Sequence, residues 1–181
     1  MKKVLILILL VLFCAGSVFG GDFEDTFKKA KQGDVAAQYS VGVMYKDGDG
    51  TTQNYKQALY WYKKAANQGF IDAQFNLGVM YYHGAGTTQD HKQAFYWFKK
   101  SAEQGDVRAQ FNLGFMYGKG EGTTQNYKSA YIWLSLAAAQ GNKDATTNRD
   151  IAAKKLTPQQ LSEAQELAAQ MQEKINSVKK P

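Results

Sequence analysis

The 181 residues suffice for one domain with a sizeable core, and the 44% hydrophobic and 21% charged residues are the proportions of an ordinary soluble protein. The net charge of +6 comes from lysines scattered along the chain rather than massed in one tract, which argues against a nucleic-acid-binding surface. Only two prolines interrupt the chain, so long helices are permitted.

The N-terminus has the pattern of a secretory signal peptide. Lys2 and Lys3 precede an apolar run over residues 4–13, and the small residues of AGSVFGG follow. We predict a signal peptide over residues 1–20, with the mature protein exported to the periplasm or the exterior. The alternative is an uncleaved anchor helix, although the apolar run is short for a membrane span.

Removal of residues 1–20 would change both the charge and the thiol content. The basic residues fall from 22 to 20 against 16 acidic residues, which leaves a net charge of +4. Cys14, the only cysteine, is lost with the signal peptide, and Phe13 before it is too large for a lipid-attachment site. We therefore expect no thiol chemistry, no lipid anchor and no integral membrane span in the mature chain.

Residues 34–141 contain one phrase repeated at a step of 36. GTTQNYKQALYWYKKAANQG from Gly50 to Gly69 returns twice with small changes, and Trp61, Trp97 and Trp133 are 36 residues apart. Before this array, residues 21–33 predict a single short capping helix. Because one copy cannot bury all of its apolar surface, we expect neighbouring copies to supply one another's core.

Each copy is expected to form two helices. The segment 71–83, IDAQFNLGVMYYH, is apolar on two opposite faces, which is typical of a helix packed between neighbours. The loop HGAGTTQ contains glycines free to adopt positive φ. The second helix then begins at a capping residue, as at Asn54, and Gln57 stands three residues later as in a capping box.

A glycine recurs inside the first helix of each copy, at Gly42, Gly78 and Gly114. Glycine costs a helix interior about 1 kcal/mol relative to alanine, so its return three times suggests close approach of another backbone or of a large ring. We expect that ring to be the tryptophan of the second helix.

The repeated pattern resembles the Sel-one-like repeat, a short relative of the tetratricopeptide repeat. In the second copy the resemblance is carried by Ala73, Asn76, Leu77, Gly78, Tyr81, Gly84, Gly86, Lys92, Ala94, Trp97, Ala102 and Gly105. It implies an all-α fold, an α/α solenoid of three 36-residue helix-turn-helix repeats whose first helices line the concave side. It also implies an adaptor or scaffold, as in many envelope or secreted bacterial proteins.

Residues 142–181 are expected to form C-terminal capping helices. NKDATTNRDIAAKKL is a degenerate first helix, and Thr157, Pro158 and Gln160 start a long final helix with a capping box. An apolar stripe from Leu161 to Ile175 could cover the last repeat. A coiled-coil or partner-binding helix is the alternative; we favour the cap because an uncovered end would expose core.

The sequence offers no apparatus for catalysis. The acidic DGDG stretch fails as a calcium loop, because its sixth and twelfth positions are Thr52 and Ala58. His83 and His91 have no second ligand at useful spacing. We expect no catalytic residue, no metal site and no cofactor.

The remaining candidate is a contact surface on the first helices, and it would hold a protein or peptide partner. Its aromatic, amide and apolar positions recur at the repeat step: Tyr39, Ser40, Val43, Phe75, Asn76, Val79, Phe111, Asn112 and Phe115. The same aromatics could instead fill the joints between repeats. The interpretation is a monomeric, non-catalytic interaction module; the alternatives are an enzyme or enzyme-associated factor acting on cell-wall material, and a structural spacer.

Overall fold

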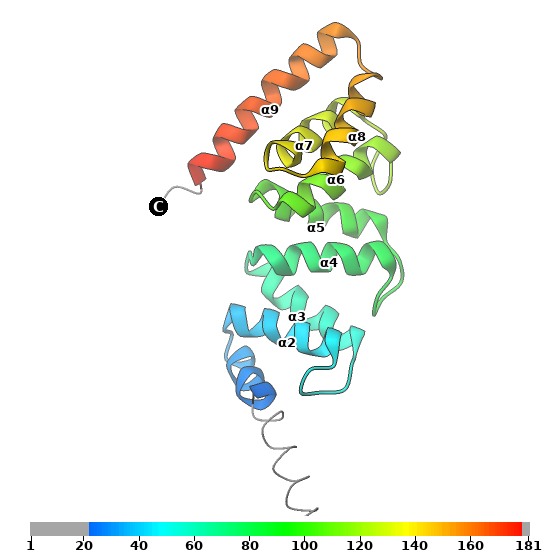
Figure 1. Ribbon diagram of the computed structural model, residues 1–181. Helices are drawn as coiled ribbons and strands as arrows, with labels where there is room; N and C mark the ends of the chain where they lie inside the picture. Colours follow the sequence, from blue (N-terminus) through cyan, green and yellow to red (C-terminus); the bar gives the residue numbers. More distant parts are fainter. Residues whose placement is uncertain (1–21, 179–181) are drawn as a thin grey trace, which may run out of the picture. The chain divides into compact units, whose positions relative to one another are not determined.

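The computed structural model describes residues 22–178, and all regular secondary structure in this range is helical (Figure 1). A helix over residues 22–31 is followed by α2 (Val35–Asp47), α3 (Tyr55–Asn67), α4 (Ile71–His83), α5 (His91–Glu103), α6 (Val107–Lys119), α7 (Tyr127–Ala139), α8 (Lys143–Ala153) and α9 (Pro158–Val178). The expected all-α fold of three helix-turn-helix repeats, α2–α3, α4–α5 and α6–α7, is confirmed. The predicted signal peptide lies outside the described residues.

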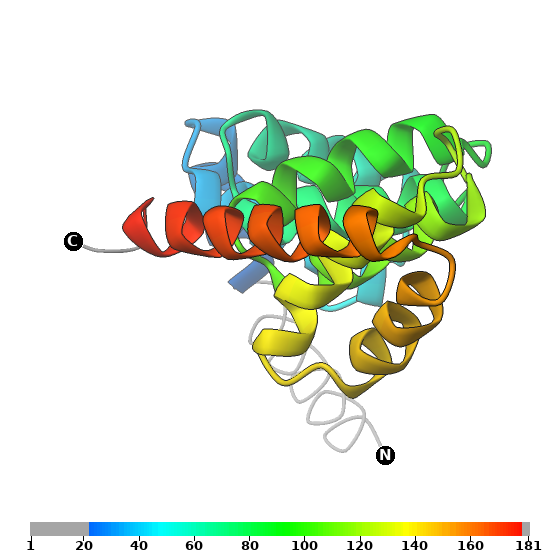
Figure 2. The same ribbon diagram turned by 90° about the horizontal axis from the view of Figure 1, so that it is seen from above.

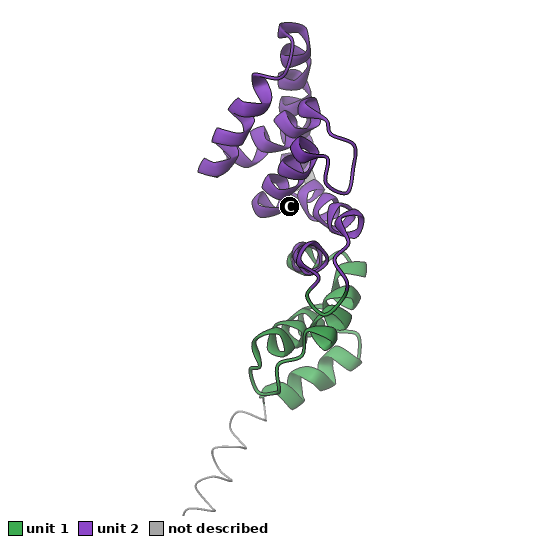
Figure 3. Ribbon diagram, turned by 90° about the vertical axis from the view of Figure 1, so that its right-hand side faces the viewer, with its two compact units in different colours: residues 1–73, 85–87 green, residues 74–84, 88–181 purple. Residues whose placement is uncertain are grey.

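The described chain divides into two compact units (Figure 3). The first contains the described residues up to 73 together with residues 85–87. Its core joins the N-terminal helix to the first repeat, because Phe23 and Ala30 pack with Val41 and Trp61. The N-terminal helix therefore buries one apolar side of the first repeat.

The second unit contains residues 74–84 and the described residues from 88 onward. One core cluster runs from α5 through α6 and α7 to α9, and it includes Phe98, Leu113, Met116, Trp133 and Ile175. The second helix of one repeat thus shares its core with both helices of the next, which is the packing that the 36-residue step predicts.

The three tryptophans lie in the interior, as predicted. The exposed fractions of Trp61, Trp97 and Trp133 are 4%, 6% and 6%. Burial of such large rings supplies several kcal/mol of stabilisation to each repeat.

The second helices begin at the predicted capping residues. The predicted capping box is wrong in one of its two hydrogen bonds, the one to the N–H of the capping residue. The Asn54 side chain accepts from the backbone N–H groups of Lys56 and Gln57, as expected. The N–H of Asn54 itself donates to the carbonyl of Tyr45 at 2.7 Å, where the box would use the Gln57 side chain. The end of the first helix thus supplies the acceptor, and it ties the two helices of a repeat together.

The recurring glycines contact a different ring from the one expected. A Cβ on Gly78 would lie 2.7 Å from the Phe98 ring, whereas the prediction was Trp97. Tyr62 and Leu134 stand in the same place for Gly42 and Gly114, each 2.6 Å from an added Cβ. Consecutive helical side chains point about 100° apart, so the residue after the tryptophan faces the glycine.

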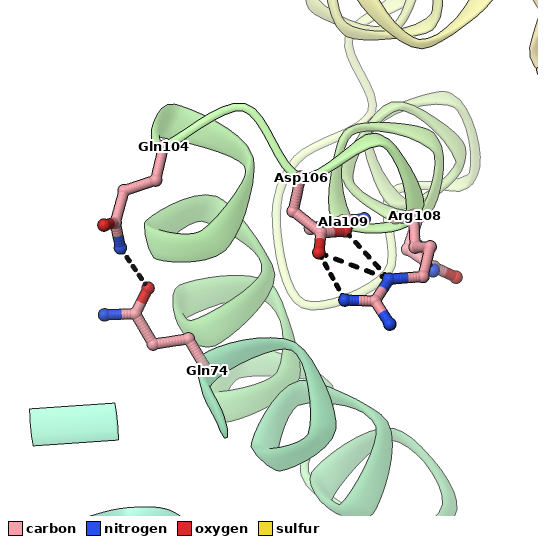
Figure 4. A network of polar contacts seen from close by, with 6 residues as sticks. Gln74, Gln104, Asp106, Arg108 and Ala109 are labelled. Carbon is pink, nitrogen blue, oxygen red and sulfur yellow. Dashed lines mark hydrogen bonds and ion pairs between the residues drawn. The ribbon is translucent and has the colours of Figure 1, made fainter. Parts of the chain in front are cut away.

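A pair of glutamines, the inner one buried, links the two helices of every repeat, and it was not predicted from the sequence. The Gln104 side chain donates to that of Gln74 at 2.7 Å (Figure 4). Equivalent pairs join Gln68 to Gln38 and Gln140 to Gln110, each at 2.8 Å. Because each inner glutamine is buried, the pair satisfies amide groups that would otherwise be costly to remove from water.

Helix α9 packs against α7 (Figures 1 and 2). Its Ala164 and Ala168 lie on Ile132, and Lys128 forms an ion pair with Glu163. The predicted capping box at its start is present, with reciprocal bonds of 3.0 and 3.2 Å between Thr157 and Gln160. Among the described helices, none is both long and apolar enough to cross a membrane.

Candidate interaction surface on the first helices of the repeats

The aromatic position of the first helices is half-buried in each repeat. The Tyr39 ring lies 4.9 Å from that of Phe70 and 5.7 Å from that of Tyr62, measured between centroids. In the next repeat the Phe75 ring lies 5.8 Å from that of Phe98. These rings pack between helices on one side, so they belong in part to the joints.

Phe75 also carries a cation on its face. The Arg108 guanidinium carbon lies 4.3 Å from the Phe75 ring centroid. Asp106 holds that guanidinium, accepting from Arg108 Nε at 3.2 Å while it also caps α6 by accepting from Ala109 N at 2.9 Å (Figure 4). The Phe75 face is therefore occupied by the protein's own arginine, a cation–π contact.

A hollow of about 260 Å³ opens where α4, α5 and α6 meet, and we call it the first hollow. Four of the predicted surface residues line it: Val79, Phe111, Asn112 and Phe115. Mostly apolar walls with a few polar groups at the edge are the usual composition of a pocket that anchors a side chain.

The Asn112 side chain is oriented by its own helix. Its Nδ2 donates to the carbonyl of Arg108 at 2.8 Å, which leaves its oxygen to accept from a ligand. The equivalent side chain in the first repeat, Ser40, donates to the carbonyl of Ala36 at 3.0 Å. An amide held in this way can bond the backbone of an extended peptide with little loss of side-chain entropy.

The polar edge of the first hollow contains a tyrosine bound to a carboxylate. The Tyr82 hydroxyl donates to Glu121 Oε2 at 2.8 Å, and His91 Nδ1 lies 3.7 Å from the same oxygen. Burial, and then the hydrogen bond and negative charge of Glu121, raise the pKa of the Tyr82 hydroxyl. The phenol therefore remains a neutral donor at physiological pH.

The predicted set is thus assembled only in part. Val79, Phe111, Asn112 and Phe115 share the first hollow, whereas Phe75 and Asn76 do not line it. Tyr39, Ser40 and Val43 belong to the other compact unit.

Three residues of the first hollow were missed by sequence reasoning: Tyr82, His83 and Phe98. From the sequence, Tyr82 was expected in the helix 71–83, and His83 was considered only as a metal ligand. They come to lie beside Asn112 only because α4 packs next to α6, the first helix of the following repeat.

No group of three or more His, Cys, Asp or Glu side chains placed to hold a metal ion occurs within residues 22–178. The ionisable groups at the first hollow are the Tyr82–Glu121–His91 cluster and the exposed His83.

The 36-residue step, the paired helices and the recurring small residues identify the fold family. The Sel1 repeat matches residues 35–70, 71–106 and 107–142, which together make up more than half of the chain. The chain belongs to the Sel1 repeat family. No curated protein matches it at the level of sequence.

Solved Sel1 repeat structures resemble this chain. A Sel1 repeat protein from Oxalobacter formigenes is 38% identical with a TM-score of 0.66, and the match covers 71% of this chain and 97% of that one. The protective antigen c5321 of uropathogenic Escherichia coli is 30% identical with a TM-score of 0.53; the match covers 88% of this chain but only 44% of that protein.

The cysteine-rich protein B of Helicobacter pylori is 19% identical, with a TM-score of 0.56, and the match covers 70% of this chain and 93% of that one. At this identity the similarity shows a shared fold alone.

Proposed function

We propose that this Sel1 repeat protein is a non-catalytic scaffold that binds a protein or peptide on the first helices of its repeats. The observation that carries the proposal is the first hollow, where apolar side chains surround a space bordered by an amide with a fixed orientation. Such a site suits one anchoring side chain and one backbone hydrogen bond of an extended segment. The candidate contact residues remain the nine positions of the sequence analysis, and the proposal is strongest for the four that line the first hollow: Val79, Phe111, Asn112 and Phe115.

We further propose that the protein acts outside the cytoplasm as a monomer, in the periplasm or after secretion. The support is the basic start, apolar run and small residues of the N-terminus. The remaining excess of lysine favours a partner with acidic character.

The test is affinity capture from the envelope fraction of the native cell, with the bound proteins identified by mass spectrometry. The double variant Val79→Ala with Asn112→Ala alters the first hollow only. Tyr96→Ala is the matched control, because Tyr96 lies on the second helix of the same repeat and is 48% exposed. All variants are checked for unchanged helicity by circular dichroism.

The proposal expects a partner that the wild type and Tyr96→Ala retain and the double variant loses. Equal recovery by all three proteins would remove the surface from consideration. The alternative of an enzyme acting on cell-wall material is checked with the same preparation, since measurable hydrolysis of muropeptides or β-lactams would replace the scaffold proposal.

A further inference from the structure

The first hollow has a counterpart one repeat later, which we call the second hollow. It measures about 260 Å³ and lies between α6, α7 and α8. Its lining includes six of the seven positions reached from the first hollow by adding 36, the exception being Thr147, the counterpart of Phe111: Phe115, Gly118, Lys119, Leu134, Asn148 and Ile151. Asn148 donates to the carbonyl of Asp144 at 2.8 Å, as Asn112 does to that of Arg108.

The two hollows differ at one decisive position. The first hollow has Tyr82, whose ring lies edge-on against His91 at 4.9 Å and whose hydroxyl binds Glu121. The second has Gly118 in the same place. It consequently extends past the backbone to Gln125, Tyr127 and Ala130, whereas the equivalent residues do not line the first hollow.

Packing does not require glycine at position 118. A Cβ there would meet only the Cβ of Ala130 at 3.8 Å, an ordinary contact, whereas a Cβ on Gly114 would lie 2.6 Å from Leu134. Glycine in a helix interior costs about 0.5–1 kcal/mol relative to alanine, and Gly118, in the last turn of α6, bears a part of this cost. At Gly118 no closer packing of the helices offsets that cost. The missing side chain leaves open space beside Ile151, an apolar side chain that is 53% exposed.

The charge at the second hollow is positive. Lys119 is the charged side chain among its lining residues, and its ammonium lies 5.7 Å from the Phe115 ring centroid. At the first hollow the protein itself provides a ring, that of Tyr82, whose hydroxyl binds the carboxylate of Glu121. In the second hollow Gly118 replaces the tyrosine, and the Lys119 ammonium lies at the edge.

We propose that the second hollow is an anchor pocket for an aromatic side chain of a bound peptide, with Lys119 pairing with an acidic residue next to it. The occupant is therefore an acidic segment of a partner protein that carries phenylalanine or tyrosine. Asn148 accepts a backbone N–H of that segment. This inference rests on the proposed function, because it names the chemistry of the partner that the first helices bind.

The probe is a short peptide with one para-fluorophenylalanine between glutamates, titrated into the purified full chain and followed by fluorine NMR. The matched peptide replaces the glutamates with lysines. Gly118→Tyr fills the second hollow with the protein's own ring, while Thr146→Tyr adds the same ring at an exposed position of α8 that lines neither hollow. Thermal melting checks that neither variant loses stability.

The wild type and Thr146→Tyr are expected to bind the glutamate peptide saturably, with at least about tenfold weaker binding by Gly118→Tyr, equivalent to about 1.4 kcal/mol. Lys119→Glu should reverse the preference between the two peptides. Unchanged binding by Gly118→Tyr, equal affinity for both peptides, or no saturable binding by the wild type would overturn the inference. If the partner of the capture experiment still depends on Val79 and Asn112 in that event, the scaffold proposal stands and only the anchor pocket fails.

Discussion

Two glycines one turn apart in α6 provide a direct test of the packing between the helices of a repeat. An added Cβ on Gly114 would lie 2.6 Å from Leu134 Cγ and 3.1 Å from the Leu134 backbone nitrogen. The same addition to Gly118 meets only Ala130 Cβ at 3.8 Å. Alanine therefore raises helix propensity at both positions but introduces a packing clash only at position 114.

The expected free energies follow from these distances. Glycine to alanine in a helix contributes about 0.5–1 kcal/mol, and for Gly118→Ala this gain is the whole effect. For Gly114→Ala, overpacking against a leucine whose backbone cannot retreat costs about 1–3 kcal/mol, so the net result is a loss. The propensity gain is full at position 114 and smaller at position 118, in the last turn of α6, so the difference between the variants slightly underestimates a clash of about 1–3 kcal/mol.

Urea unfolding followed by far-UV circular dichroism measures the free energy of unfolding of both variants. Gly118→Ala should raise the midpoint and Gly114→Ala should lower it, with unchanged slopes. Equal midpoints for the two variants would refute the reasoning, because they would mean that α7 does not approach α6 as closely as the structure has it.

Three further predictions concern polar groups. Gln110→Ala should lower the free energy of unfolding by about 1–3 kcal/mol, because it removes a buried side chain that donates to the Ala102 carbonyl and accepts from Gln140. Gln125→Ala removes an exposed hydrogen bond to the Gly118 carbonyl and should lose clearly less in the same urea experiment. The Lys128 hydrogen bond lowers the pKa of Glu163 in the folded protein. The ion pair therefore stabilises the fold at pH values above the pKa of glutamate in the unfolded chain, about 4.3. This stabilisation is lost as the pH falls through the lower pKa of Glu163 in the folded protein. The urea midpoints of wild type and Glu163→Gln should accordingly converge as the pH is lowered through that range, and a constant gap would contradict the assignment. Glu121→Gln should lower the pKa of Tyr82, although the part of the upward pKa shift caused by burial should remain. The ring carbon shifts of labelled tyrosine in an NMR titration measure this pKa. An unchanged pKa would mean that Glu121 does not lie beside the hydroxyl.

Much of the fold could be predicted from repetition alone. The step of 36 placed the tryptophans in the core and the helix caps at Asn54, Asp90 and Asn126, because periodic apolar and capping residues reflect local physics. The ring facing Gly78 was assigned wrongly because Trp97 and Phe98 are adjacent and both apolar. A difference of about 100° in helical phase separates them, and only the packed helices reveal it.

The glutamine pairs and the two hollows could not be predicted from the repeat, because they depend on how the helices cross. Gln74 and Gln104 are neutral amides that are also common on surfaces, and their burial depends on the crossing of two helices. The hollow around Asn112 arises where one first helix meets the next, so its wall includes Tyr82, which is remote in sequence. The repeat step itself could have pointed to Gly118, since it is the position at which the third copy lacks the ring of the second.

The central claim is that adjacent repeats supply one another's interior. Hydrogen exchange measured by mass spectrometry on Phe98→Ala tests it most directly, because Phe98 belongs to the second repeat but packs in one cluster with Leu113 and Met116 of the third. The account predicts that protection falls in α6 together with α5. Loss of protection confined to α4 and α5, with α6 exchanging as in the wild type, would contradict it.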